Sequence, residues 1–498
     1  MLRYHRLDHS VSMFLLNSKL SKMKKIKLFT IITFSFLTIS SCDDFGDINV
    51  DPNSAVNVPA SVLLPTAQYR LYSMLNGVGV NADFGLLMVQ QWAQNEYTED
   101  SRYNFDINSF NGVFGSLYID ILKELKEAKG IIETNDIESD EKSNKKYIID
   151  VMTAQAFAVL TDGFGDIPYT EALSDITSPK YDTQADIYKS LLNNLDLAAS
   201  GFKTNKSSFN SGDILFNGDV SKWKKFTNSL MLRYAVRIAD VDATTAETYI
   251  TKAINGGVFT SNADNADFNY PDVDARANPL YRNHNSQIGN RDDYSVSKLL
   301  VDTLSGMSDP RLEKFAKPNA TGSIVGMPYG LSDNDATALQ STTSRPNDNV
   351  RSATTPFHII TYAEVQFLLA EAYARGLASG DAQVAYDNGV TASMNQWGIE
   401  DAAAISSYIT ANAFDSANWK ASIGLQKWIA LYMNGFEAWN EWRRLDQPVL
   451  TPTPNGVFSS IPLRFTYPLS ETQNNSEQLL KVTSKPGDLT AKVWWDKN

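Results

Sequence analysis

Apolar residues recur at steps of three and four along most of the chain, which is the pattern of helices with one buried face. The spacing predicts helices over residues 112–130, 147–160 and 221–239. Ser221 precedes the first turn of the third helix, where its hydroxyl can accept a backbone N–H as an N-cap. Because the helical period dominates, the sequence predicts a mainly all-α fold, in which strands are confined to minor β-hairpins.

A second group of helices begins at Thr361. Thr361 and Glu364 have the spacing of a capping box, in which the Thr side chain accepts the Glu amide and the Glu side chain reaches back to the cap. This helix and a second one over residues 381–396 together have roughly the 34-residue length of a tetratricopeptide unit. Earlier helix pairs near residues 112–160 and 185–239 are interpreted as more degenerate units of the same kind.

Aromatic residues form a stripe on the last strong helix, which is predicted over residues 425–442. Trp428, Trp439 and Trp442 lie there at helical spacing. Such a stripe can form a binding platform, but large aromatic side chains on one helix face are more often core, and we interpret these as core. The proline-rich segment that follows predicts an extended tail that wraps the helical body.

Between about residues 257 and 358 the helical pattern breaks down. Asn, Asp, Ser, Thr, Pro and Gly recur, apolar residues are isolated, and the one convincing helix lies near residues 293–305. Irregular segments of this length in a compact domain are more often functional than idle. We therefore predict that this loop-rich region carries the ligand-binding surface of a single domain over residues 61–498.

The start of the chain has the layout of an export signal. Three lysines precede an apolar segment over residues 28–39, and small residues then lead to Cys42, the only cysteine in 498 residues. The apolar segment is too short to span a bilayer, which takes roughly 20 apolar residues. Residues 39–42 resemble a bacterial lipobox, so we predict a lipoprotein signal peptide over residues 23–41 and lipidation of Cys42.

The segments on either side of this signal differ in kind. Met23 directly precedes the lysines, so residues 1–22 are interpreted as an over-extended gene start. Residues 42–60 are polar and lack a helical period, which predicts a lipidated tether.

The mature chain is strongly acidic. Residues 1–41 hold seven of the 44 Lys and Arg residues and one of the 57 Asp and Glu residues, so the mature chain carries a net charge of −19. This balance disfavours nucleic acid as a partner, because phosphates require a basic footprint. An acidic chain is also not attracted to anionic lipid, so we expect the lipid anchor alone to attach the protein to a membrane.

The sequence carries no motif for covalent or metal-assisted catalysis. The mature part has only His284 and His358, without metal-ligand spacing, and it lacks a GxSxG elbow, a Walker loop and a GxGxxG turn. Pairs of carboxylates such as glycosidases use are inevitable among 56 acidic residues, so their presence is no evidence for glycosidase activity. Four loop acids are candidate Ca²⁺ ligands but lack EF-hand order, so we interpret them as solvated and predict no required cofactor. They are Asp264, Asp267, Asp272 and Asp274.

Five segments, in order along the chain, resemble the SusD/RagB family of nutrient-binding lipoproteins of Bacteroidetes. They are the acidic lipobox segment at 39–53, FGDIPY at 164–169, WKKFTNSL at 223–230, the ITYAEV to AEA stretch at 360–372 and the QKWIAL to NGFEAW stretch at 426–439. Together they cover essentially the whole mature chain.

The resemblance implies a body of four tetratricopeptide-like units that binds nutrients without catalysis. It implies an outer-membrane lipoprotein, exposed at the cell surface and docked over a SusC-like TonB-dependent transporter. Asp43, Asp44 and Asp47 fit the surface-export signal that such lipoproteins carry after the lipidated cysteine. The implied cargo is an oligosaccharide, or a peptide in RagB-like members.

A sugar receptor needs exposed aromatic rings flanked by amide, carboxylate and guanidinium groups, because a sugar offers apolar faces and a rim of hydroxyls. Two stretches supply such groups, and the first lies roughly where the family places part of its ligand platform. The candidate ligand-binding residues are Trp92, Asn95, Tyr97 and Tyr103 in the first stretch and Tyr270, Tyr281, Arg291, Tyr294 and Tyr329 in the second. Two alternatives stay open: a surface glycoside hydrolase, and a helical-repeat adaptor that binds proteins and no small ligand.

Overall fold

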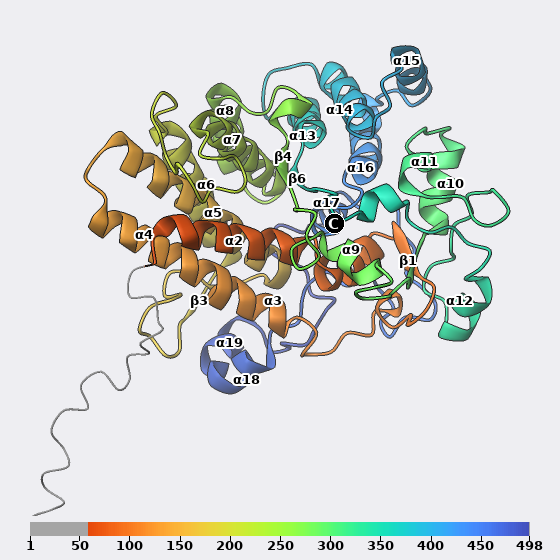
Figure 1. The fold of residues 1–498 in the computed structure, drawn as a ribbon, viewed down its shortest axis with the longest axis horizontal. Coiled ribbons are helices and arrows are strands. Elements are labelled where there is room, and N and C mark those ends of the chain that lie inside the picture. The colour runs from red at the N-terminus through yellow and green to blue at the C-terminus, as the bar shows by residue number, and fades with distance from the viewer. Residues whose placement is uncertain (1–57, 498) are drawn as a thin grey trace, which may run out of the picture. The chain divides into compact units, whose positions relative to one another are not determined.

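The apolar periodicity folds into helices that pack on their neighbours in sequence (Figure 1). The computed structural model describes residues 58–497, so the predicted signal peptide and Cys42 lie outside the described part. In the first half α2 packs on α4, α4 on α5, α5 on α6, α6 on α7 and α7 on α8. These helices are α2 (Ala60–Leu75), α4 (Lys123–Asn135), α5 (Asp140–Phe164), α6 (Gln184–Gly201), α7 (Val220–Arg237) and α8 (Ala243–Gly256).

Two π-helical segments interrupt the first half. The segment η1 (Val78–Leu86) follows α2, and η3 (Ser116–Leu122) lies between α3 (Asn111–Gly115) and α4. The helix predicted over residues 112–130 is thus a continuous helical stretch with a π segment inside it. A mainly all-α fold is confirmed.

The second half repeats the pairing. The strongest packing joins α13 to α14, and α16 packs on both α13 and α17. These helices are α13 (Tyr362–Ala374), α14 (Ala382–Gln396), α15 (Ala402–Ala411), the 3₁₀ turn η6 (Ser416–Asn418), α16 (Trp419–Ala430) and α17 (Gly435–Leu445). The proline-rich tail is mostly irregular, as predicted, and includes two short helices, α18 (Leu469–Asn474) and α19 (Ser476–Val482).

The region predicted to be irregular contains more short elements than the single helix expected. Local caps such as Asn278 and Ser332 start helices too short to show a period in the sequence. The elements are η4 (Asn262–Asp264), β4 (Ala266–Phe268), α9 (Pro279–His284), β5 (Tyr294–Val296), α10 (Lys298–Gly306), α11 (Leu312–Phe315), α12 (Asp333–Leu339), η5 (Asp348–Arg351) and β6 (Phe357–Ile360).

The strands form short antiparallel pairs. β1 (Trp92–Gln94) pairs with β5, β4 pairs with β6, and β2 (Ile167–Pro168) pairs with β3 (Tyr181–Asp182). The first two pairs join segments far apart in the sequence instead of adjacent ones. β1–β5 joins the irregular region to the segment that follows η1, and β4–β6 joins the two ends of the irregular region.

Two helix starts differ from the sequence interpretation. Thr361 caps α13, because its side chain accepts the Glu364 amide at 3.2 Å. The Glu364 carboxylate does not complete the box; it is buried and pairs with Arg233 instead. At α7 the N-cap is Asp219, whose carboxylate accepts two amides at 2.9 and 3.1 Å, so Ser221 lies inside the helix.

The helix predicted over residues 425–442 is two helices. Met433 has a left-handed φ of 74° between α16 and α17, and the Asn434 side chain caps the second helix. The apolar period continues across the break, so periodicity in the sequence does not reveal where the first helix ends. Trp428, Trp439 and Trp442 are buried, so their interpretation as core is confirmed.

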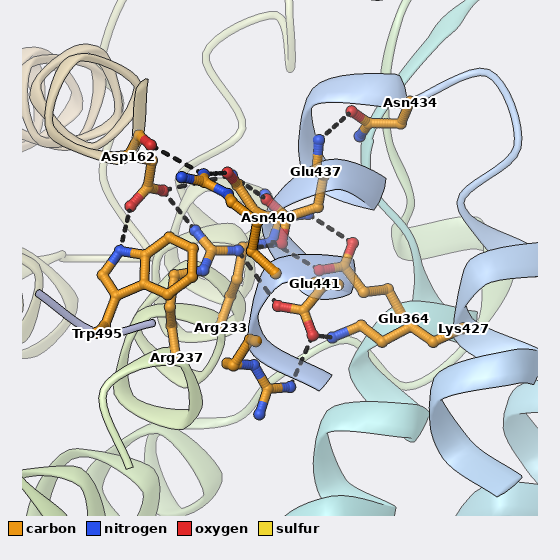
Figure 2. Close-up of polar contacts among 12 residues, drawn as sticks. Asp162, Arg233, Arg237, Glu364, Lys427, Asn434, Glu437, Asn440, Glu441 and Trp495 are labelled. Atoms are coloured by element: carbon orange, nitrogen blue, oxygen red, sulfur yellow. Dashed lines mark hydrogen bonds and ion pairs between the residues drawn. The ribbon is translucent and has the colours of Figure 1, made fainter. Parts of the chain in front are cut away.

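Charged side chains from α5, α7, α13, α16 and α17 meet in the interior (Figure 2). This charge cluster has five carboxylates and five cations, so its formal charges cancel. Its members are Asp162, Arg233, Arg237, Glu364, Glu371, Lys427, Glu437, Glu441, Arg443 and Arg444.

Arg237 is the central link of the charge cluster. Its guanidinium donates to Asp162 at 2.6 Å, to Glu437, and to Glu441 at 3.4 Å (Figure 2). Asp162 also accepts the indole N–H of Trp495 in the tail at 3.0 Å. A buried charge is tolerated when it is paired and hydrogen-bonded, so these contacts hold α5, α7, α17 and the tail in one arrangement.

Candidate functional site

The pairing of β1 with β5 brings the two predicted ligand-binding stretches together. Trp92 lies opposite Val296, and Gln94 lies opposite Tyr294. The backbone N–H of Asn95 extends the pairing by donating to the Asp293 carbonyl at 2.8 Å. Residues about two hundred positions apart in the sequence therefore share one surface.

A cavity of about 300 Å³ lies at this junction and is called here the Tyr97 cavity. Its volume is at the lower end of the range for small-molecule sites, which suits part of an oligomeric ligand. Its lining is mostly polar. It consists of Val78, Asp83, Gln94, Tyr97, Glu99, Asp100, Asn283, Arg291, Asp293 and Tyr294.

Tyr97 is the exposed aromatic ring of this cavity. Its side chain is 52% exposed, and a left-handed φ of 53° turns the chain just after β1. The Arg291 guanidinium lies 4.5 Å from the ring centroid, a cation–π distance. Asp293 holds Arg291 in place through a 2.6 Å ion pair. The arrangement presents an aromatic ring beside a guanidinium, two groups that can contact a sugar face and its hydroxyls.

Two carboxyl groups of the cavity are unusually basic. Burial raises the pKa of Asp83 to about 7, the negative charge of Asp100 adds to this, and a hydrogen bond from the Tyr294 hydroxyl opposes it. Burial likewise raises the pKa of Asp100 to about 6, against the hydrogen bond that it accepts from the Gln94 amide at 2.9 Å. Near neutral pH the two carboxyls therefore change between hydrogen-bond acceptor and donor.

A π-helix supplies part of the cavity lining. Val78 and Asp83 both belong to η1, and π segments are frequent at functional sites. Gly85 of the same segment lies against Gly435 at the start of α17, so closely that a Cβ on Gly85 would lie 2.3 Å from the Gly435 carbonyl carbon. This backbone contact ties the cavity to the helix that carries much of the charge cluster.

Other predicted ligand residues are buried. Trp92 is 1% exposed, and its indole N–H donates to the Tyr432 hydroxyl at 3.0 Å. Asn95 is buried and its amide donates to the Asp292 carbonyl at 3.0 Å. Tyr103 and Tyr270 are also buried. None of these four side chains lines the Tyr97 cavity, and each has a role in packing or in holding the loops.

The two remaining candidates lie outside the cavity. Tyr281 is half-buried and accepts a hydrogen bond from the Asn285 amide at 2.7 Å. Tyr329 is half-buried, with its ring centroid 6.4 Å from that of Tyr103. Of the nine predicted residues, the cavity thus unites Tyr97, Arg291 and Tyr294.

Sequence reasoning missed the acidic lining of the cavity. Asp83, Glu99, Asp100 and Asp293 were four acids among many, and no local motif marks them. Glu99, Asp100 and Asp293 lie within three residues of Tyr97 or Arg291, and this closeness is the one signal in the sequence.

The four loop acids considered as Ca²⁺ ligands, and interpreted as solvated, do not form one group. Asp264 pairs with Lys225 at 2.8 Å, and Asp267 pairs with His358 at 2.7 Å. Within residues 58–497, no group of three or more His, Cys, Asp and Glu side chains is placed to hold a metal ion. No helix in this described part is long and apolar enough to cross a membrane.

Paired helices, minor long-range strands and a polar cavity with one exposed aromatic ring define a helical-repeat binding protein. The chain belongs to the SusD-like family, because residues 52–468 match the family described as starch-binding and associating with the outer membrane. The prediction made from the five segments is therefore confirmed at the level of the family. Members of this family are binding proteins associated with the outer membrane of Bacteroidetes. A comparison with curated proteins gives no match.

Solved structures share the fold over nearly their whole length. A chitin-binding protein is 29% identical, with a TM-score of 0.78 over 88% of this chain and 99% of that chain. A SusD-like protein of Bacteroidetes is 25% identical, with a TM-score of 0.78 over 89% of this chain and 100% of that chain. A chitin-binding SusD homologue from Flavobacterium johnsoniae is 22% identical, with a TM-score of 0.76 over 87% and 99%.

Proposed function

We propose that this protein captures oligosaccharides at the Tyr97 cavity and delivers them to a SusC-like TonB-dependent transporter. The observation that carries the proposal is the meeting of the two predicted stretches at β1 and β5 around an exposed ring. The ring can cover an apolar sugar face, while Arg291, Asp83 and Asp100 supply partners for hydroxyl groups.

The first cargo to test is a chitin-derived oligosaccharide. This choice is supported by the 29% identical structure described as a chitin-binding protein. The family description names starch, so maltooligosaccharides are the second arm of the test. Peptides are the third arm, since they are the cargo of RagB-like members.

The experiment is isothermal titration calorimetry of the mature chain with each ligand class. Tyr97→Ala should weaken oligosaccharide binding about tenfold or more, because it removes the stacking surface. Tyr249→Ala is the matched control: its ring also lies beside a cation, with Lys252 at 5.0 Å, but on α8 and outside the cavity. Equal weakening by both variants, or tight binding of peptides alone, would contradict the proposal.

The glycoside hydrolase alternative has one observation in its favour. Asp83 and Asp100 line the same cavity, and both have a raised pKa. Each carboxyl is already bound to a neighbour, Asp83 to Tyr294 and Asp100 to Gln94, which favours a binding role. Incubation of the protein with chitin and starch oligomers should therefore release no new reducing ends. If reducing ends are released, and Asp83→Asn and Asp100→Asn abolish their release, the protein is a glycoside hydrolase instead.

We also propose that Cys42 is lipidated and holds the domain at the outer face of the outer membrane. The acidic residues after Cys42 support surface exposure. The full chain should co-purify from membranes with a TonB-dependent transporter. Co-purification with soluble proteins alone, together with absent oligosaccharide binding, would favour the adaptor alternative.

A further inference from the structure

A second cavity, of about 370 Å³, lies where the start of α6 meets the C-terminal tail. It is called here the α6–tail cavity, and it shares no lining residue with the Tyr97 cavity. Three elements build it: the end of α5, the first turn of α6 and the tail around Arg464 and Trp494.

Arg464 is the buried cation of this cavity. The residue is 7% exposed and lines the cavity, yet its Nε is buried and has no hydrogen-bond partner. Its Nη2 donates to two tail carbonyls, of Lys485 and Asp488, at 3.4 and 3.2 Å, and its guanidinium lies 4.9 Å from the Tyr467 ring centroid. The buried Nε is closed to a ligand, so Arg464 contributes to this cavity through the positive charge of the guanidinium that lines it.

The start of α6 and Lys492 add positive potential to the lining. α6 has 18 residues and begins there, so the positive end of its dipole adds to the local potential, while Asp166 and Thr183 already accept two of its first amides. Lys492 adds an ammonium group whose side chain is 47% exposed and whose nearest carboxylate, of Asp496, lies 3.9 Å away. Half-buried Trp494 forms a wall against which a compact ligand can pack.

One carboxylate lines this cavity and is already engaged. Asp166 accepts the Gln184 amide at 2.8 Å, and burial raises its pKa. The lining therefore has two cations, Arg464 and Lys492, against one carboxylate, in a protein whose net charge is −13. The lining itself is therefore positive, with the carboxylates of Asp488 and Asp496 next to its two cations.

We propose that the α6–tail cavity binds a compact oxyanion, such as the carboxylate of an acidic sugar, with Arg464 and Lys492 as its cationic contacts. This site is separate from oligosaccharide capture at the Tyr97 cavity. It would give the protein a second contact for charged cargo or for a charged small ligand. The shared chemistry is a compact oxyanion, either free or carried by a sugar ring, and the test distinguishes these two sources.

Calorimetry with the mature chain should use three probes: glucuronate, inorganic sulfate and neutral glucose. Glucuronate binding with no sulfate binding identifies an acidic sugar, binding of both identifies a general oxyanion site, and glucose should not bind here. Lys492→Gln should weaken the anion about threefold, and Arg464→Gln should weaken it about tenfold. Lys481→Gln, which removes the same charge from an exposed position on α19 outside the lining, should change nothing.

Lys492→Gln guards against a folding artefact, because its exposed side chain is far less constrained than that of Arg464. Anion binding that is equally strong in Lys492→Gln, Arg464→Gln and wild type would overturn the proposal. So would the absence of saturable binding for both anions. Tyr97→Ala should leave anion affinity unchanged, which separates failure of this site from failure of the proposed function.

Discussion

Removing Arg237 should strongly destabilise the fold. Arg237→Met keeps a long apolar stem but takes the guanidinium away from Asp162, Glu437 and Glu441, which are all buried. Breaking a buried pair by deleting one partner costs about 3–5 kcal/mol, because the other charge is left without compensation. Asp162 would keep its bond from Trp495, which does not replace the lost positive charge.

The assay is urea unfolding followed by tryptophan fluorescence, with Lys298→Met as the control. Lys298 pairs with Asp302 on the surface, where both side chains are 58% exposed, so this variant should change the free energy of unfolding by about 0.5 kcal/mol or less. Adding Asp162→Asn to Arg237→Met should recover part of the loss, since Arg237 is the ion-pair partner of Asp162, whereas Glu437 keeps Arg233 at 3.5 Å and Glu441 keeps Lys427 at 2.8 Å. A cost below about 1 kcal/mol for Arg237→Met alone would refute the view that the paired charges hold these helices together.

Three further predictions concern Asp83, Trp92 and the lipid anchor. Asp83 binds a proton in the folded state up to a pH of about 7, whereas an ordinary carboxyl releases it near 3.8, so its contribution to stability falls as pH rises between these values. Asp83→Asn should therefore gain stability relative to wild type from pH 4.5 to 7.5 in urea unfolding, and a constant difference would contradict the assigned pKa. Trp92→Phe should cost about 1–3 kcal/mol in the same assay, through lost packing and the lost bond to Tyr432, with oligosaccharide affinity unchanged; a stable variant that no longer binds would make Trp92 a ligand contact. Cys42→Ser should abolish incorporation of labelled palmitate and release the protein from membranes, and retained label would disprove lipidation at Cys42.

The helical body could be predicted because its signal is local. Periodicity alone placed the helices that became α5, α7 and α14, and it assigned the tryptophan stripe to the core. Prediction from the sequence failed where a tertiary contact overrides a local sequence preference. Glu364 occupies a capping-box position, yet the buried Arg233 takes its carboxylate, because an unpaired buried guanidinium would cost more than an unfilled cap.

The binding site was only partly predictable, for the same reason. Trp92 and Tyr97 lie five residues apart in one aromatic, polar stretch. The pairing of β1 with a segment about two hundred residues later buries Trp92, and the left-handed turn after the strand leaves Tyr97 exposed. No local pattern distinguishes these outcomes. The acidic lining around Asp83 depends in turn on the π-helical path of η1, which a period of 3.6 does not reveal.

The most direct test of the central claim is a crystal structure of the mature chain with a chitin-derived hexasaccharide. We predict that a sugar ring lies against Tyr97, with hydroxyl groups within hydrogen-bond distance of Arg291, Asp83 or Asp100. A bound oligosaccharide that leaves the Tyr97 cavity empty and contacts another surface would contradict the proposed site.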